Sequence, residues 1–185
     1  MGLRNSSSDY GSLARWLHWL AAIGIAYLIY LGLLQSDMER GVDRDAVRAT
    51  HASIAMLVLL VMTTRLVWRF LNVAPAHPEG VPAWQRTTAA LVHWGLYIAV
   101  FMQLAVGMMV VATGGKPIPF FGLFSIPLPV AESPDAHELL EEVHEVMWWL
   151  IAVLIIVHAL GAIYNHVVLK NAVLRRMTVG VSRSG

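Results

Sequence analysis

The sequence contains no cysteine, which excludes disulfide bonds, thiolate-bound iron–sulfur clusters and covalent c-type haem attachment through Cys-x-x-Cys-His. A metal site in this chain therefore needs histidine, carboxylate or methionine ligands. Charged residues are also scarce, at 14% of the 185 residues, against about 25% in an ordinary soluble domain. Together with the 57% of hydrophobic residues, this shortage of charge indicates a membrane-embedded protein.

Four apolar segments are long enough to cross a bilayer, which takes about 20 residues. We place the predicted membrane helices at residues 13–34, 52–71, 83–112 and 134–169. The first is too long for the apolar region of a cleaved signal, and no small-residue cleavage site follows it, so we interpret it as a retained helix. Because irregular backbone cannot face lipid, the chain is predicted to be all-α, with residues 1–185 forming a single integral membrane four-helix up-down bundle.

Breaker residues separate the later segments. They are Pro75, Pro78, Gly80 and Pro82 in the second connection, and Gly114, Gly115, Pro117, Pro119, Pro127 and Pro129 in the third. Ser133-Pro134-Asp135 has the order of an N-cap, a first-turn proline and an acid that suits the helix dipole, so the fourth helix is expected to begin there and run long. The apolar segment at residues 120–124 is either a lid over one end of the bundle or part of an interfacial aromatic belt.

Basic residues are distributed unevenly between the two predicted faces of the membrane. Nine lie with the two ends of the chain and the second connection: Arg4, Arg15, Arg65, Arg69, Arg86, Lys170, Arg175, Arg176 and Arg183. Four lie on the other side: Arg40, Arg44, Arg48 and Lys116. Ten of the twelve acids also lie on that other side. The positive-inside rule therefore predicts that both termini are cytoplasmic.

Histidine is the main chemical signal, because a polar side chain inside a membrane helix is costly and is a functional-site hypothesis by default. Three of the eight histidines are expected to lie outside the functional centre: His77 and His137 as solvated residues, and His166 beyond the last ligand. The other five lie within or at the edge of apolar segments: His18, His51, His93, His144 and His158.

The fourteen-residue spacing from His144 to His158 puts both on one helix face, about 21 Å apart along the axis. His51 opens the second segment at the level of His144, and His18 lies near the level of His158. Two neutral imidazoles from facing helices can clamp a flat macrocycle, so two such pairs predict two stacked haems. By depth alone, His93 is equally able to replace His18. The alternatives are histidines that hydrogen-bond the helices together or line a proton path.

Three arginines lie near the predicted inner pair. Arg15 and Arg65 are candidates for pairing with haem propionates, since guanidinium suits carboxylates, or else are topology-setting charges with snorkelling side chains. Arg69 lies on the same helix face as Arg65, and for it we favour the topology-setting interpretation.

The sequence resembles the bacterial cytochrome b561 family over nearly its whole length. The resemblance rests on Arg15-Trp16-Leu17-His18-Trp19, on His51, on Thr64-Arg65-Leu66-Val67-Trp68-Arg69, on Phe121-Gly122-Leu123-Phe124 and on the two histidines fourteen apart. It implies a four-helix protein of the bacterial inner membrane with two haem b groups. Carried over, its ligand set is His18 with His158 for the inner haem and His51 with His144 for the outer. His93 is then a candidate for quinone binding or proton handling.

The resemblance also implies oxidation of superoxide at the periplasmic face and reduction of ubiquinone. The periplasmic loops, however, hold ten acids against four bases, a net charge of −6 that repels an anion. Lys116 and Arg48 are candidates for a local positive funnel. The alternatives are an electron-transfer subunit that docks a periplasmic redox protein or larger dehydrogenase, and a haem-free bundle or transporter. The expected partners are the membrane, quinone and a periplasmic electron donor, with no nucleic acid.

Overall fold

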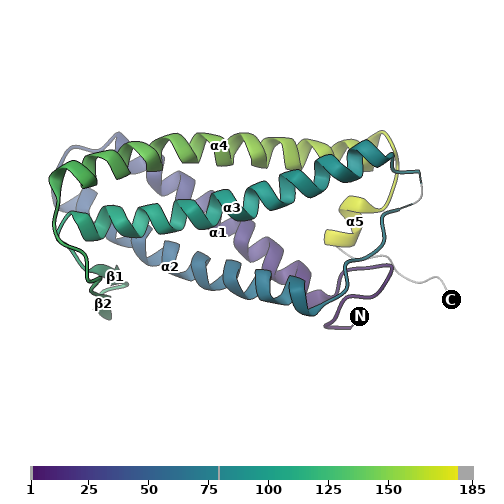
Figure 1. The fold of residues 1–185 in the computed structure, drawn as a ribbon, viewed down its shortest axis with the longest axis horizontal. Coiled ribbons are helices and arrows are strands. Elements are labelled where there is room, and N and C mark those ends of the chain that lie inside the picture. The colour runs from purple at the N-terminus through teal and green to yellow at the C-terminus, as the bar shows by residue number, and fades with distance from the viewer. Residues whose placement is uncertain (1, 79, 179–185) are drawn as a thin grey trace.

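The computed structural model describes residues 2–78 and 80–178. Four long helices run alternately up and down the bundle (Figure 1), namely α1 (Ser12–Ser36), α2 (Val42–Leu71), α3 (Ala83–Thr113) and α4 (Pro134–Val167). A two-stranded antiparallel hairpin, β1 (Ile118–Phe120) with β2 (Phe124–Ile126), follows α3, and the short α5 (Val173–Met177) follows α4. The predicted four-helix architecture is confirmed, with the small hairpin as an addition.

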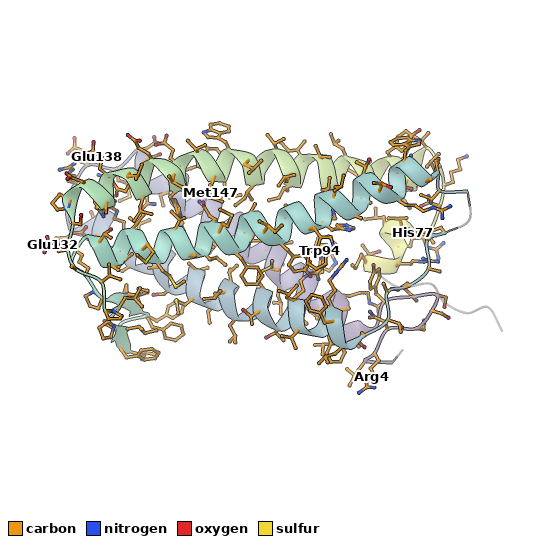
Figure 2. The ribbon with its side chains drawn as sticks, viewed as in Figure 1. Arg4, His77, Trp94, Glu132, Glu138 and Met147 are labelled. Atoms are coloured by element: carbon orange, nitrogen blue, oxygen red, sulfur yellow. The ribbon has the colours of Figure 1, made fainter. Side chains whose placement is uncertain are left out.

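The bundle has two distinct ends. The end that carries the hairpin, the α1–α2 connection and the start of α4 is called the hairpin end. The opposite end, with the N-terminal segment, the α2–α3 connection and α5, is called the terminal end. In Figure 2, Glu132 and Glu138 lie at the hairpin end, whereas Arg4 and His77 lie at the terminal end. Arg183, which was counted with the terminal-end cations, lies outside the described residues.

Helix α2 begins at Val42, ten residues earlier than predicted. The prediction followed the apolar stretch, but the preceding charged residues are helical as well. Asp43 and Asp45 lie in the first turn, where acidic side chains stabilise the positive end of the helix dipole. His51 therefore does not open the helix but lies nine residues inside it, and Arg44 and Arg48 are helical residues that precede it.

The start of α4 is as predicted. Ser133 is the N-cap, its hydroxyl accepts from the Ala136 N–H at 3.4 Å, and Pro134 is the first helical residue. The Ser133 N–H donates to the Thr113 carbonyl at 3.0 Å, so the start of α4 is tied to the end of α3. The helix runs for 34 residues.

All four long helices are long and apolar enough to span a membrane. Large apolar side chains are exposed along each of them, for example Ile23, Leu60, Leu91 and Leu150. A soluble monomer rarely exposes so much contiguous apolar surface, so these faces are suited to lipid. The buried core is small and central, and contains Ala21, Val58, Met62, Tyr97, Ala99, Val100, Leu104 and Ile151.

Ser53 attaches the hairpin to α2. Its side chain is buried, donates to the carbonyls of Ala49 (2.8 Å) and Pro119 (3.2 Å), and accepts from the Phe121 N–H at 2.9 Å. Phe121 and Gly122 have φ of 48° and 71°, as a tight hairpin turn of the I′ type requires. Because a phenylalanine rarely adopts this conformation, the bond that the Phe121 N–H donates to Ser53 Oγ stabilises a turn that is otherwise strained.

The hairpin combines features of both interpretations of residues 120–124. Ile118 is 2% exposed, and β1 lies against α2, where residues 117–119 form part of a cavity wall. Leu123 and Phe124 are exposed, as expected of apolar groups at a membrane interface.

We expect Ser53→Ala to loosen the hairpin, because the part-buried Phe121 N–H then loses its acceptor. The expected local loss is about 1–3 kcal/mol, measured as faster amide exchange at residues 118–126 in detergent. Thr50→Ala is the matched control, since the Thr50 hydroxyl, among the described residues, bonds only the Ala46 carbonyl of its own helix. Equal protection of the hairpin in wild type and Ser53→Ala would contradict this role.

Candidate functional site

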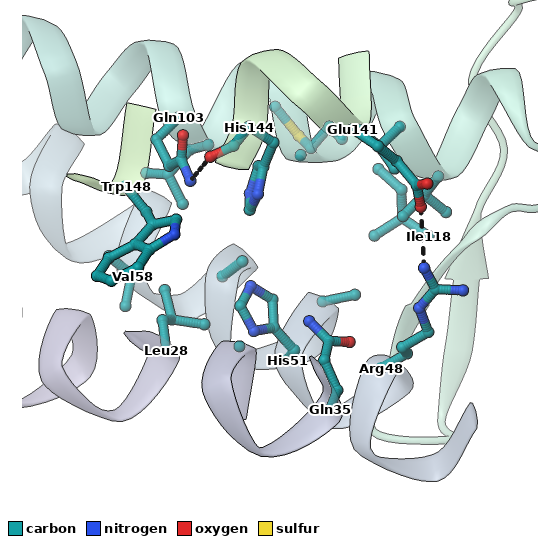
Figure 3. A pocket seen from close by; sticks show the side chains of 18 of the residues that line it. Leu28, Gln35, Arg48, His51, Val58, Gln103, Ile118, Glu141, His144 and Trp148 are labelled. Atoms are coloured by element: carbon teal, nitrogen blue, oxygen red, sulfur yellow. Dashed lines mark hydrogen bonds and ion pairs between the residues drawn. The ribbon is translucent and has the colours of Figure 1, made fainter. Parts of the chain in front are cut away.

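The first candidate site lies at the hairpin end, where His51 of α2 faces His144 of α4. Their ring centres are 6.3 Å apart, with an angle of 62° between the ring planes. Figure 3 shows the two imidazoles, one from α2 and one from α4, pointing toward one another across a cavity. The sequence prediction that these two histidines lie at one level of the bundle agrees with this arrangement.

The separation of the rings leaves room for a metal ion between them. A metal–imidazole bond is about 2 Å long and a ring centre lies about 1.2 Å behind the bonded nitrogen, so two imidazoles on opposite sides of one ion have centres roughly 6 to 6.5 Å apart. In addition, His51 Nδ1 is buried and has no hydrogen-bond partner among the described residues. A buried nitrogen of this kind calls for a partner that the protein itself does not supply.

The cavity around this pair has a volume of about 820 Å³, within the range of sites for large organic ligands. Leu28 and Val58 contribute apolar wall, and the aromatic ring of Trp148 lies beside them (Figure 3). A cavity with apolar walls and two facing imidazoles fits a flat, largely apolar macrocycle with a metal at its centre.

Two residues of α3 support the position of His144. The Gln103 side-chain amide donates to the His144 carbonyl at 3.0 Å (Figure 3). A Cβ at Gly107 would lie 3.2 Å from His144 Nε2, so glycine leaves the imidazole its space. Neither residue was predicted from the sequence, although a side-chain amide inside an apolar membrane segment is costly and, like an imidazole there, indicates a functional site.

The second candidate site lies toward the terminal end and contains three imidazoles. The ring centre of His158 (α4) lies 6.0 Å from that of His18 (α1) and 5.1 Å from that of His93 (α3). The first distance is close to that of the hairpin-end pair, whereas the second is about 1 Å shorter and corresponds to direct ring contact. His18 and His93, which the sequence left as alternative partners of His158, therefore both lie beside it.

Arg65 lies near this second group, and Arg15 lies one turn before His18 in α1. Arg15 is 8% exposed, and Arg65 Nη1 donates to the Ala14 carbonyl at 3.2 Å. Arg65 is also close enough to His18 and His158 to interact electrostatically with both rings.

Arg69 has a defined contact, although it was interpreted as a topology-setting charge. Its guanidinium carbon lies 5.1 Å from the Trp94 ring centre and 5.8 Å from that of Tyr97. At these distances a cation is attracted to the faces of the rings, so Arg69 helps to join α2 to α3.

A polar cluster lines the cavity at the hairpin end and consists of Arg48, His137 and Glu141. Arg48 donates to Glu141 Oε1 at 2.9 Å, and the same oxygen lies 3.4 Å from His137 Nε2. His137 Nδ1 bonds the Val110 carbonyl at 2.9 Å. The expectation that His137 is an ordinary solvated residue is therefore wrong, because the first turns of α4 pack against α3. His77, in contrast, is exposed as expected.

The two candidates for a positive funnel differ. Arg48 is compensated by Glu141, so it adds little positive field. Lys116 is exposed, lines the cavity and forms no ion pair among the residues that the structure describes.

Comparison with known proteins gives a consistent result. Residues 9–180 match the family described as prokaryotic cytochrome b561. Cytochrome b561 homolog 2 of Escherichia coli (strain K12) is 27% identical over 179 residues, which cover 96% of this chain and 95% of that protein. Cytochrome b561 homolog 1 of the same organism is 28% identical over 163 residues, 88% of this chain and 92% of that protein. The matched region includes all four long helices and both histidine groups.

Proposed function

The chain belongs to the prokaryotic cytochrome b561 family of membrane electron-transfer proteins, and from this premise we propose that it carries electrons from the periplasmic side of the bacterial inner membrane to quinone. Membership of the family implies b-type haem. The observation that supports the fuller proposal is the presence of two groups of facing imidazoles at two depths of one bundle.

We assign two haem b groups to these two sites. His51 and His144 would hold the one at the hairpin end, and His18 and His158 the one toward the terminal end. The ring separations of 6.3 and 6.0 Å favour these pairs over His93 with His158 at 5.1 Å. Bound there, the haems supply reversible one-electron chemistry.

The protein's own contribution is to position the ligands and exclude water. His144 and His158 lie on one continuous helix, so their separation, about 21 Å along the axis, is fixed by helix geometry. Ile151 lies midway between them and belongs to the buried apolar core with Val58 and Leu104. The region between the two sites is therefore apolar, which disfavours ions and bulk water in the electron path.

The charge distribution supports an orientation. The hairpin end and its adjoining turns carry ten acids and four bases, whereas nine bases lie with the terminal end. By the positive-inside rule, the hairpin end faces the periplasm and the terminal end the cytoplasm.

Quinone reduction is assigned to the terminal end, beside His93. Converting a quinone to a quinol takes two electrons and two protons, so the acceptor site needs a proton-transferring group. His93 is the imidazole left over by the proposed ligand pairs, and it touches His158 directly. Arg15 and Arg65 are close by, as counter-ions for haem propionates. We take ubiquinone as the acceptor.

Two electron donors suit the periplasmic end. Superoxide, which loses one electron to become dioxygen, is the donor that the family resemblance suggests, and Lys116 is the cation available to attract it. A basic redox protein, or a larger dehydrogenase to which the chain docks as a subunit, is favoured by the net charge of −6 and by the compensation of Arg48.

The ligand pairs predict which variants lose haem. The purified wild type is expected to contain about two low-spin b-type haems per chain. His144→Ala should remove the hairpin-end haem and spare the other, and His158→Ala should do the reverse, as measured by haem-to-protein ratio and reduced visible spectra. His77→Ala, at an exposed histidine, is the matched control. A purified wild-type protein without visible haem absorbance would contradict the whole proposal.

The leftover imidazole predicts a separation of haem binding from quinone chemistry. His18→Ala should lose the terminal-side haem, whereas His93→Ala should keep both haems and reduce quinol formation about 100-fold, mainly in kcat, because a proton-transfer group is lost. Stopped-flow quinone reduction and haem content together measure this. Loss of a haem in His93→Ala but not in His18→Ala would reverse the assignment.

The charge of the hairpin end predicts the salt response of superoxide oxidation. Because the local field is negative, we expect the rate with superoxide and ubiquinone to rise as ionic strength increases. Lys116→Gln should lower the rate about threefold, and Lys170→Gln, at the other end, should not. A rate that falls with added salt would instead establish a positive funnel, and no superoxide consumption would favour a protein donor.

A further inference from the structure

The cations in the wall of the hairpin-end cavity all lie on one side of the imidazole pair. Arg44 and Arg48 precede His51 in α2, and Lys116 follows α3. On the other side the wall is apolar except for the side-chain amide of Gln103. Figure 3 shows Arg48 near Ile118 at one end of the cavity, and Val58 and Trp148 at the opposite end.

This polarity restricts how a haem fits between His51 and His144. Haem b carries two propionate carboxylates, and burying a carboxylate among apolar side chains without a partner is strongly unfavourable. The propionates must therefore face the hairpin end, where the arginines and the lysine lie.

Arg48 and Arg44 are not equivalent there. Arg48 is bonded to Glu141, which leaves it little capacity for another carboxylate. Arg44 takes part in neither of the two ion pairs found among the described residues. Its Nε is buried and has no hydrogen-bond partner in that part of the chain, so a buried donor lacks an acceptor.

The position of Arg44 matches the direction of the cavity. Arg44 lines both the hairpin-end cavity, which holds the two imidazoles, and an adjoining cavity of about 470 Å³ that Arg40 also lines. Arg44 and His51 are seven residues apart, which is almost two full turns, so both lie on the same face of α2 about 10 Å apart along its axis. One helix face thus presents an imidazole and, toward the aqueous end, a guanidinium whose buried Nε has no acceptor among the described residues.

We propose that Arg44 binds a propionate carboxylate of the hairpin-end haem, so that α2 would supply both an imidazole that holds this haem and the counter-ion of its propionate. A guanidinium presents parallel N–H donors that match the two oxygens of a carboxylate. This assignment rests on the proposed haem at His51 and His144. From the sequence alone, Arg44 was predicted only to contribute to the membrane topology.

The charge of Arg44 should then raise the reduction potential of the hairpin-end haem. A nearby cation disfavours the more positive ferric state, so its removal should favour oxidation. In Arg44→Gln we expect the reduction equilibrium of the hairpin-end haem to shift toward ferric by roughly threefold to tenfold, where tenfold corresponds to about 59 mV for one electron. Spectroelectrochemical titration of the purified full chain measures this, and the haem in question is the one lost in His144→Ala.

The control variants separate local binding from general charge. Arg40→Gln removes the same charge from the adjoining cavity but not from the imidazole cavity, and should shift the equilibrium less than twofold. Arg44→Lys keeps the charge and should retain most of the wild-type potential, which also covers the case in which Arg44→Gln fails to fold.

A second measurement identifies the carboxylate. Haem labelled with ¹³C at its propionate carboxyls, produced by feeding labelled precursor to the expressing cells, reports those groups in redox difference infrared spectra. The labelled bands of the hairpin-end haem should move in Arg44→Gln and Arg44→Lys, and stay in place in Arg40→Gln.

The remaining outcomes overturn the assignment in distinct ways. If the wild-type potential depends on added acetate at constant ionic strength, and Arg44→Gln abolishes this dependence, the site binds free anions instead. If both haems are present and neither potential nor labelled bands respond to Arg44, the inference fails while the haem sites stand. If the wild type lacks the haem that His144→Ala removes, the proposed function fails first.

Discussion

Lipid provides no water for polar groups, and this constraint governs where every histidine of the bundle can lie. An imidazole within the apolar span must find its partner inside the protein, because the outer helix faces are covered with exposed leucine, isoleucine and valine. The structure gathers five imidazoles into two groups, one around His144 and one around His158. His51 Nδ1 is still buried without a hydrogen-bond partner among the described residues. The small apolar core between them, around Ile151, then separates the two groups along a single helix.

Helix α2 connects most features of the hairpin end. Its apolar part carries His51, and its charged extension carries Arg44 and Arg48 above the same cavity. Ser53, two residues beyond His51, bonds the hairpin and so helps to fix the cavity wall formed by β1. A change in the register of this one helix would displace an imidazole, a guanidinium and the wall together.

The two ends of the bundle differ in the partners that they suit. At the hairpin end, Arg48 and His137 share the carboxylate of Glu141, and the surrounding acids leave a negative field that repels small anions. Toward the terminal end, Arg65 lies near the three clustered imidazoles. This asymmetry is consistent with an electron donor selected by charge on one side and an acceptor that needs protons on the other.

The sequence alone determined the four helices and the pairing of histidines by depth, because both follow from apolar length and from the fixed rise of a helix. It also predicted the start of α4 from Ser133. The start of α2 was missed because charged residues give no apolar signal, and the hairpin because its strands are only three residues long. Only the tertiary structure decided that His18 lies 6.0 Å and His93 5.1 Å from His158, since distances across a bundle depend on how helices pack. It also decided which guanidinium is compensated, because Arg48 meets Glu141 only when α2 and α4 are side by side.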